Sequence, residues 1–162
     1  MTRDVGDLID VDASECLNAT DPLSWTSVLA RGALGGPAGA LASDDDHELL
    51  IRLVFVVPVR ARALVIRSPS TGADADVSGV GTLRVFVNGQ AMGFENVARR
   101  KPAQTLSGAG EHALDATAFD AVRALTIFVE SNDKGTARTV ISEIRVFGDA
   151  LASTDVAALK PC

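Results

Sequence analysis

Two apolar runs separated by a proline decide the fold class: LLIRLVFVV at residues 49–57, Pro58, and VRARALVI at residues 59–66. In the first run every odd position is apolar and Arg52 lies on the other face, which is the period of a strand that buries at least one side. The second run alternates in the same phase, with its odd positions on one face. Because a proline interrupts a β-ladder, we expect Pro58 to end the first strand and a tight corner to join two antiparallel neighbours.

Three more segments, residues 82–88, 125–129 and 139–146, alternate in the same way. Turn residues follow the first at Asn88-Gly89 and separate the other two at residues 131–135. Short strands with few helical stretches between them predict an all-β fold, a β-sandwich or a barrel, and not alternating βαβ units. The residues expected to converge on one core between two sheets are Leu49, Ile51, Leu53, Phe55, Val57, Leu83, Val85, Val87, Leu125, Ile127 and Val129.

Helices and ordered loops are expected to be minor. A short helix is predicted over residues 22–29, with Asp21 as its cap and a proline at the first helical position, and a turn at residues 117–119. The Gly/Ala-rich stretch 31–40 and residues 68–81 have loop composition, and we expect both to be mobile surface loops.

The length of 162 residues and 16.8 kDa predicts one domain, residues 1–162, without internal repeats. A chain of this size buries about 68–70% of its unfolded surface, so a hydrophobic core holds it without disulfides or metals. Residues 1–15 and 149–162 lack clear periodicity. They are expected to lie along the sandwich as an extended arm and a tail.

Charge and hydropathy exclude several classes of partner. The 15 Lys and Arg against 21 Asp and Glu give a net charge of −6, which opposes binding to nucleic acid or to an anionic membrane surface. No apolar stretch approaches the roughly 20 residues that span a bilayer. The amino terminus is acidic from Asp4 and has no secretory signal pattern, which predicts a cytoplasmic or nuclear protein with Cys16 and Cys162 as free thiols.

The sequence contains no recognisable motif of an enzyme active site. His47 follows three aspartates and His112 follows a glutamate, so both are interpreted as solvated loop residues without a neighbouring nucleophile. There is no Gly-x-Ser-x-Gly motif, and Gly79-Val80-Gly81 lacks the third glycine and the following helix of a nucleotide-binding turn. We therefore expect no enzyme and no cofactor.

A cluster of carboxylates could hold a hard cation: Asp44, Asp45, Asp46 and Glu48. The cluster does not have the spaced Asp-x-Asp-x-Asp-Gly order of a calcium loop, so the better interpretation is a solvated turn that leads into a strand. We expect no metal.

The connection from residue 88 to residue 104 is the best candidate for a binding surface, because it is long and mixes apolar residues with cations. Its candidate contact residues are Met92, Phe94, Arg99, Arg100 and Lys101. A basic patch of this kind suits an acidic partner. The alternative is that Met92 and Phe94 only anchor the loop to the core, in which case the contact lies on Asp44, Asp45 and Asp46, on the loop with Asn132, or on the carboxyl-terminal tail.

Several segments in order resemble the PITH domain: residues 16–18, 43–51, 55–59, 85–88, 92–94, 127–132 and 139–148. The resemblance covers nearly the whole chain, and its specificity lies in the order and spacing of motifs that are individually weak. Three features depart from the family pattern: Glu48 stands where glutamine is common, the Gly/Ala-rich stretch 31–40 is unusual, and the tail ends at Pro161-Cys162.

The resemblance implies a jelly-roll β-sandwich similar to galactose-binding-like domains. In its best known setting a PITH domain follows a thioredoxin domain and docks on the proteasome. No thioredoxin segment occurs in these 162 residues, so the resemblance implies a binding role and not redox activity.

We therefore expect a monomeric, non-enzymatic interaction module that binds a protein, with the regulatory particle of the proteasome or an associated ubiquitin-pathway complex as its implied partner. The alternative is a jelly roll that binds a small ligand or carbohydrate with the loops at one end of the sandwich. Six Phe, one Trp and no Tyr offer few rings on which a sugar could stack.

Overall fold

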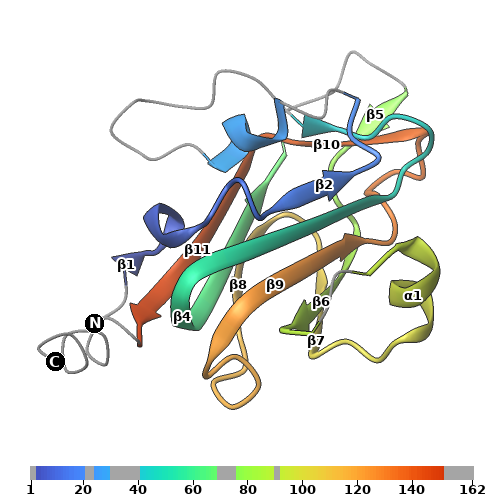
Figure 1. Cartoon of the computed structure of the whole chain (residues 1–162). Coiled ribbons are helices and arrows are strands. Elements are labelled where there is room, and N and C mark those ends of the chain that lie inside the picture. The colour runs from blue at the N-terminus through green and yellow to red at the C-terminus, as the bar shows by residue number, and fades with distance from the viewer. Residues whose placement is uncertain (1–2, 21–23, 30–40, 69–75, 90–91, 152–162) are drawn as a thin grey trace, which may run out of the picture.

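Strand β4 (Leu49–Arg67) connects the two halves of the computed structural model (Figure 1). Its first half pairs with β2 (Glu15–Leu17) and β9 (Val122–Val129), and its second half pairs with β8 (Gly110–Ala113) and β11 (Glu143–Ala150). All four pairings are antiparallel. The residues that the structure describes are 3–20, 24–29, 41–68, 76–89 and 92–151.

A sharp bend around Pro58 divides β4 between two layers (Figure 1). The ladder with β9 jumps from the pair Val54–Ala124 to the pair Val59–Val122, so the proline falls where no ladder hydrogen bond is needed. The expected corner is therefore present, but two expectations are wrong. Pro58 does not end the strand, and the two runs are not antiparallel neighbours, because they diverge from the bend into different layers.

Each layer is an antiparallel sheet. The first layer has the order β2–β4–β9–β6–β7, in which β6 is Thr82–Val87 and β7 is Gln104–Ser107. The second has the order β1–β11–β4–β8, in which β1 is Arg3–Asp4. The topology is the expected jelly-roll β-sandwich of the galactose-binding-like kind.

A small third sheet consists of β3 (Leu41–Ala42), β10 (Arg138–Ile141) and β5 (Val77–Ser78), with β5 parallel to β10. The strand expected at residues 139–146 is divided at Ser142, whose N–H donates to the carbonyl of Arg67 at 2.8 Å. Residues on either side of Ser142 therefore belong to different sheets.

The core lies between the two layers and contains the predicted inward face. Val57 at the bend and Val87 at the end of β6 are half-buried. The confirmed core residues are Leu49, Ile51, Leu53, Phe55, Leu83, Val85, Leu125, Ile127 and Val129. The alternating side chains on one face of each strand are thus buried together, because a shift of the strand register by one residue would turn all of them toward solvent.

The second half of β4 departs from the predicted alternation. Phe147 pairs with Ala63 and Gly148 pairs with Ala61, so one extra residue of β4 forms a β-bulge. Beyond the bulge Leu64 and Ile66 enter the core, so the odd positions of the second run do not all lie on one face as predicted. Gly148 permits this close approach, since a Cβ atom there would lie 1.9 Å from the carbonyl oxygen of Arg60.

The amino-terminal segment contributes to the core. Val5 is fully buried, the 3-10 helix η1 (Gly6–Leu8) follows it, and Ile9 forms a bridge with Phe55. The second half of residues 68–81 likewise differs from the expected surface loop, because β5 and Val80 pack into the structure. Residues 31–40 and the tail from residue 152 lie outside the described residues.

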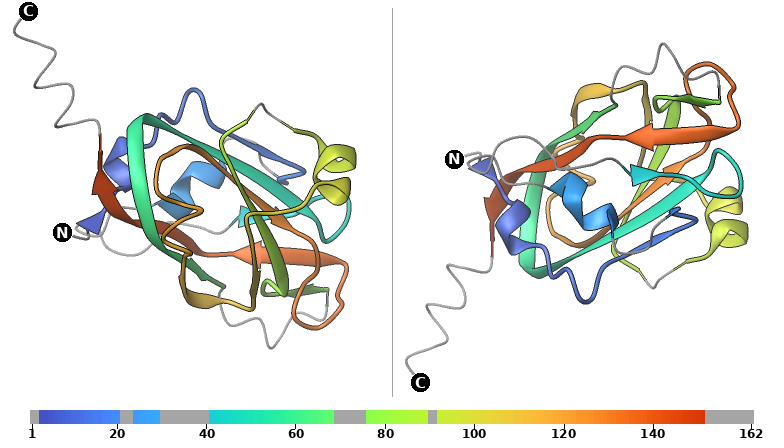
Figure 2. Two further views of the ribbon diagram at one scale, coloured as in Figure 1. Left: turned by 90° about the horizontal axis from the view of Figure 1, so that it is seen from below. Right: turned by 90° about the horizontal axis from the view of Figure 1, so that it is seen from above.

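Besides η1, the described part of the chain contains two further short helices. The 3-10 helix η2 (Ser24–Leu29) occupies the predicted helical segment, and residues 21–22, its expected cap and first residue, lie outside the described residues. The predicted turn at residues 117–119 is closed by the Phe119 N–H, which donates to the carbonyl of Asp115. Helix α1 (Phe94–Arg99) was not expected, and in both views of Figure 2 it lies at the far side of the molecule from β1.

Candidate binding surface

The described parts of the 88–104 connection, residues 88–89 and 92–104, place the predicted contact residues. Asn88 and Gly89 have positive φ angles of 58° and 76°, as the predicted turn requires. The side-chain oxygen of Asn96 accepts from the Gly93 N–H at 3.0 Å, and the Val97 N–H donates to the Gly93 carbonyl at 3.1 Å. These bonds satisfy donors at the start of α1 and set its direction over the first layer.

Helix α1 packs on the outer face of the first layer through a second, smaller core. Leu50, Phe86, Val97 and Phe128 are its buried members, and Met92 and Phe94 pack against them. The rings of Phe94 and Phe128 form an edge-to-face pair with centroids 6.1 Å apart. Phe94 therefore anchors the connection, which was the alternative that the sequence left open, and both Met92 and Phe94 are half-buried.

The three predicted cations lie at and after the end of α1. Arg84 donates from its guanidinium to the carbonyls of Ala98 and Arg100 at 3.3 and 2.8 Å, which fixes the chain leaving the helix. Arg99, Arg100 and Lys101 are exposed, and none of them forms an ion pair with another described residue. We call these three residues the basic edge.

A shallow pocket of about 250 Å³ adjoins the basic edge. Its lining brings together Met92, Arg100 and Lys101, together with Phe86, Gly89 and Pro102 among others. Pockets for drug-sized ligands measure about 300–1,000 Å³, so this one suits a single side chain of a partner better than a free small molecule. Of the five candidates on this connection, the structure therefore gathers three around one recess, with Arg99 beside it and Phe94 beneath the helix.

The acidic turn Asp44–Asp46 is held by Asn18 at φ 71°. The Asn18 side-chain N–H group donates to the Asp46 carboxylate at 2.9 Å, and the Asn18 side-chain oxygen accepts from the Asp45 N–H at 3.1 Å. The Asp46 carboxylate also accepts from the Glu48 N–H. Within the described residues, no group of three or more His, Cys, Asp or Glu side chains is placed to hold a metal ion.

Asn132 is buried and uses its amide within its own loop. The side-chain nitrogen donates to the carbonyls of Thr136 and Arg138 at 3.0 and 3.1 Å, and the side-chain oxygen accepts from the Thr136 N–H at 3.0 Å. A recess of about 220 Å³ beside it is lined by His47, Ser131, Asn132, Gly135 and Thr136. This end of the sandwich offers no phenyl or indole ring in that recess, and its best hydrogen-bonding residue is already satisfied.

Three titratable groups clarify the chemistry of the chain. His47 and His112 contact the carbonyl oxygens of Glu130 and Gly108 through Nε2, and His112 lies in strand β8 and not in a loop as expected. Cys16 is a free thiol whose pKa is raised to about 12 by burial and by the neighbouring charge of Glu15. At neutral pH this thiol stays protonated and is a poor nucleophile.

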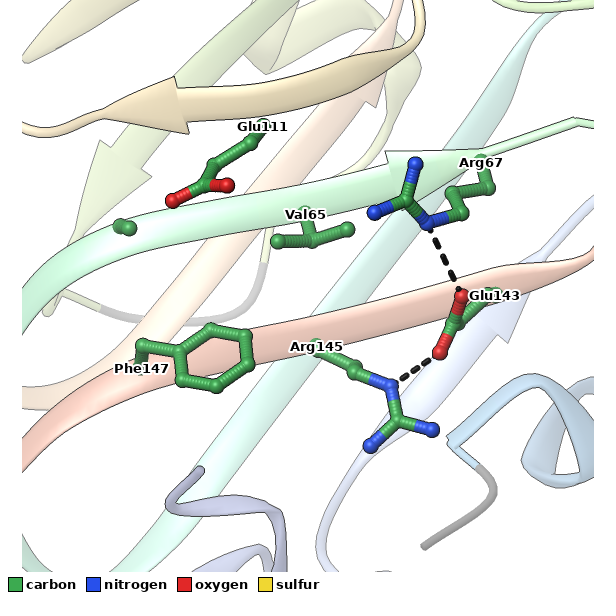
Figure 3. A pocket seen from close by; sticks show the side chains of 7 residues that line it. Val65, Arg67, Glu111, Glu143, Arg145 and Phe147 are labelled. Atoms are coloured by element: carbon green, nitrogen blue, oxygen red, sulfur yellow. Dashed lines mark hydrogen bonds and ion pairs between the residues drawn. The ribbon is translucent and has the colours of Figure 1, made fainter. Parts of the chain in front are cut away.

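A groove of about 480 Å³ on the outer face of the second layer was missed by the sequence analysis (Figure 3). Its residues come from β4, β8 and β11: Ala63, Val65, Arg67, Glu111, Glu143, Arg145 and Phe147. No local signal marks it, because Ala63 and Val65 face outward only as a result of the β-bulge opposite Gly148.

Comparison with known families assigns the chain. The family model described as PITH domain matches residues 1–160. The chain belongs to the PITH domain family. Membership indicates a protein-interaction module of a non-catalytic family. No helix among the residues described for this PITH domain is long and apolar enough to cross a membrane.

Solved structures similar to this PITH domain share its fold at low sequence identity. A carbohydrate-binding module, CBM32-3, from a family 31 glycoside hydrolase of Clostridium perfringens is 8% identical with a TM-score of 0.57, over 88% of this chain and 96% of that one. The family 32 module of NanJ from the same organism, in complex with galactose, is 10% identical with a TM-score of 0.55, over 91% and 99%.

Some similar structures are enzymes that contain such a domain. A family 89 glycoside hydrolase from Clostridium perfringens is 12% identical with a TM-score of 0.60, and the match covers 92% of this chain but 15% of the enzyme. At these identities the similarity establishes the jelly-roll fold of this PITH domain and nothing about its ligand.

Proposed function

We propose that this PITH domain is a non-catalytic module that binds an acidic surface of a partner protein through its basic edge. One observation carries the proposal: three adjacent exposed cations find no ion-pair partner among the described residues, in a chain whose net charge is −6. Adjacent cations without internal partners favour an oppositely charged surface and speed its encounter. The pocket beside them adds an apolar contact at Met92 and Pro102.

The partner we propose is the regulatory particle of the proteasome or an associated ubiquitin-pathway complex. The resemblance of the sequence to PITH domains supports this choice, and the binding would take place in the cytoplasm or nucleus with the domain as a monomer. The proposal that the module is not an enzyme is supported by the two histidines, whose Nε2 atoms face backbone carbonyls and not a serine or cysteine.

The test is the double charge reversal Arg99→Glu with Arg100→Glu, assayed against purified proteasome regulatory particle by biolayer interferometry. We expect the Kd to rise about tenfold or more at low salt and by less at high salt, because exposed ion pairs are screened. The melting temperature should change little, since both side chains are exposed.

The matched control is Lys134→Glu with Arg138→Glu, which changes the net charge by the same amount at exposed positions beside the loop of Asn132. This variant should bind as the parent does. If the control weakens binding and the first variant does not, the contact lies at that loop and the basic edge is not the binding surface.

A further inference from the structure

The groove on the second layer has an apolar floor on a face that would ordinarily be polar. Val65 is 4% exposed although it points away from the core, and the smaller Ala63 lies beside it. Phe147 pairs with Ala63 across the ladder and stands at the edge of the groove (Figure 3). A large side chain next to a small one leaves a hollow between them.

Charged side chains surround this floor. Arg145 is held by Glu143 and by the carboxylate of Asp4 at 2.9 Å, and the Arg67 Nε atom lies 3.2 Å from Glu143. Glu111, opposite Val65 in the β8 ladder, is exposed and forms no ion pair with a described residue. Glu143 in the groove and Asp4 outside it pair with the two guanidinium groups, so Glu111 is the carboxylate of the lining that has no ion-pair partner among the described residues.

We propose that this groove binds a lysine or arginine side chain of a second partner protein, with the cationic head at Glu111 and the aliphatic stem along Val65 and Phe147. The charge left on Glu111 is complementary to such a head. Long basic side chains bury their methylene stems on apolar surface while the charge stays in water, and an aromatic ring beside the cation adds to the attraction.

The groove and the basic edge differ in the charge of the side chains that have no ion pair with another described residue, and they lie on different faces of the molecule. The basic edge follows α1, which covers the outer face of the first layer, whereas the groove lies on the outer face of the second. Occupation of one surface therefore leaves the other open. The inference concerns a second contact and does not depend on the proposed role of the basic edge.

The test is a titration of the ¹⁵N-labelled full chain with two capped peptides, Ac-Gly-Leu-Arg-Leu-Gly-NH2 and the matched Ac-Gly-Leu-Gln-Leu-Gly-NH2. We expect the arginine peptide to shift the amide signals of Val65, Glu111 and Phe147 and to bind about fivefold more tightly than the glutamine peptide, the effect of one exposed ion pair. Glu111→Gln should remove this fivefold preference. The control Glu15→Gln, an exposed glutamate on β2, should keep it.

Equal binding of the two peptides would overturn the proposal, as would shifts that fall outside the groove or no shifts at millimolar peptide. Glu111 is exposed, so its replacement leaves the fold intact, and an unchanged melting temperature verifies this. The Arg99→Glu and Arg100→Glu variant should keep the preference for the arginine peptide, which separates a failure here from a failure of the basic edge.

Discussion

Glu48 is a residue whose ionised form is disfavoured in the folded chain. Its pKa is raised from 4.5, first by burial and then by the charge of Asp46; His47 lowers it by less than these, and the charge of Glu130 raises it slightly further. A carboxyl whose pKa is raised by folding contributes stability at low pH and loses it as the pH rises through the folded-state value. The glutamate thus costs stability at neutral pH.

We therefore expect Glu48→Gln to be more stable than the parent at neutral pH, with the advantage vanishing at a pH below 4.5. Urea unfolding at several pH values measures this difference. The control Glu111→Gln removes an exposed carboxylate without an ion pair among the described residues and should not share the advantage at neutral pH. A constant advantage of Glu48→Gln across the whole range would contradict the assignment.

Helix α1 is the element whose packing presents the basic edge, and Phe94 is its anchor. Phe94→Ala removes the contact with Phe128 and leaves a gap over the first layer. Because the ring is half-buried, we expect a loss of about 2 kcal/mol in the free energy of unfolding, less than for a fully buried phenylalanine. Binding of the acidic partner should weaken as the cations lose their orientation.

Phe94→Leu, which keeps most of the apolar contact, should restore both stability and binding. Chemical denaturation and the interferometry assay measure the two effects on the same samples. If Phe94→Ala abolished binding while stability stayed unchanged, the ring itself would touch the partner and would not serve as an anchor.

The three central strands of the first layer, β4 up to its bend, β9 and β6, could be predicted from the sequence, but the short edge strands β2 and β7 and the bulged half of β4 could not. Near Leu53 and Ile127, a single polar residue on the opposite face, Arg52 and Thr126 respectively, indicates which positions of the period-two pattern face inward. From residue 63 to residue 66 all four residues are apolar, and the local pattern allows either face to be buried. The choice depends on Gly148, which is distant in the sequence and permits the bulge.

The candidate binding surfaces also differ in how far they could be predicted from the sequence. The basic edge is contiguous in the sequence, so charge alone indicated Arg99, Arg100 and Lys101. The groove is assembled from three strands and depends on register, which no single stretch encodes. Helix α1 is six residues long, too short for a convincing helical period.

At the scale of the whole molecule, β4 makes the two layers one unit. Phe55 lies just before the bend and belongs to the core between the layers. Phe55→Ala should lower the free energy of unfolding by about 3–5 kcal/mol. Because the layers share a strand, the loss should appear equally in both, in a single transition that far-ultraviolet dichroism and fluorescence report together.

Hydrogen exchange provides the more local measurement. Amides of Ile51 in the first layer and Ile66 in the second should lose protection by the same factor in Phe55→Ala. Two separate transitions, or loss of protection in one layer alone, would show that the bend uncouples the layers. Ile66→Val, with a smaller expected loss of about 0.5–1.5 kcal/mol, serves as the comparison from the other end of the strand.

Gly148 has a consequence for how such chains diverge. No side chain fits at this position without displacing the strand that carries Arg60. Substitution of this glycine is therefore not tolerated as long as the β-bulge is retained. A related chain with any other residue at the equivalent position has to pair its strands in a different register. Its outer face would then lack the hollow beside Phe147. The presence of glycine at this one position is thus a simple marker for which descendants of the fold inherited the groove.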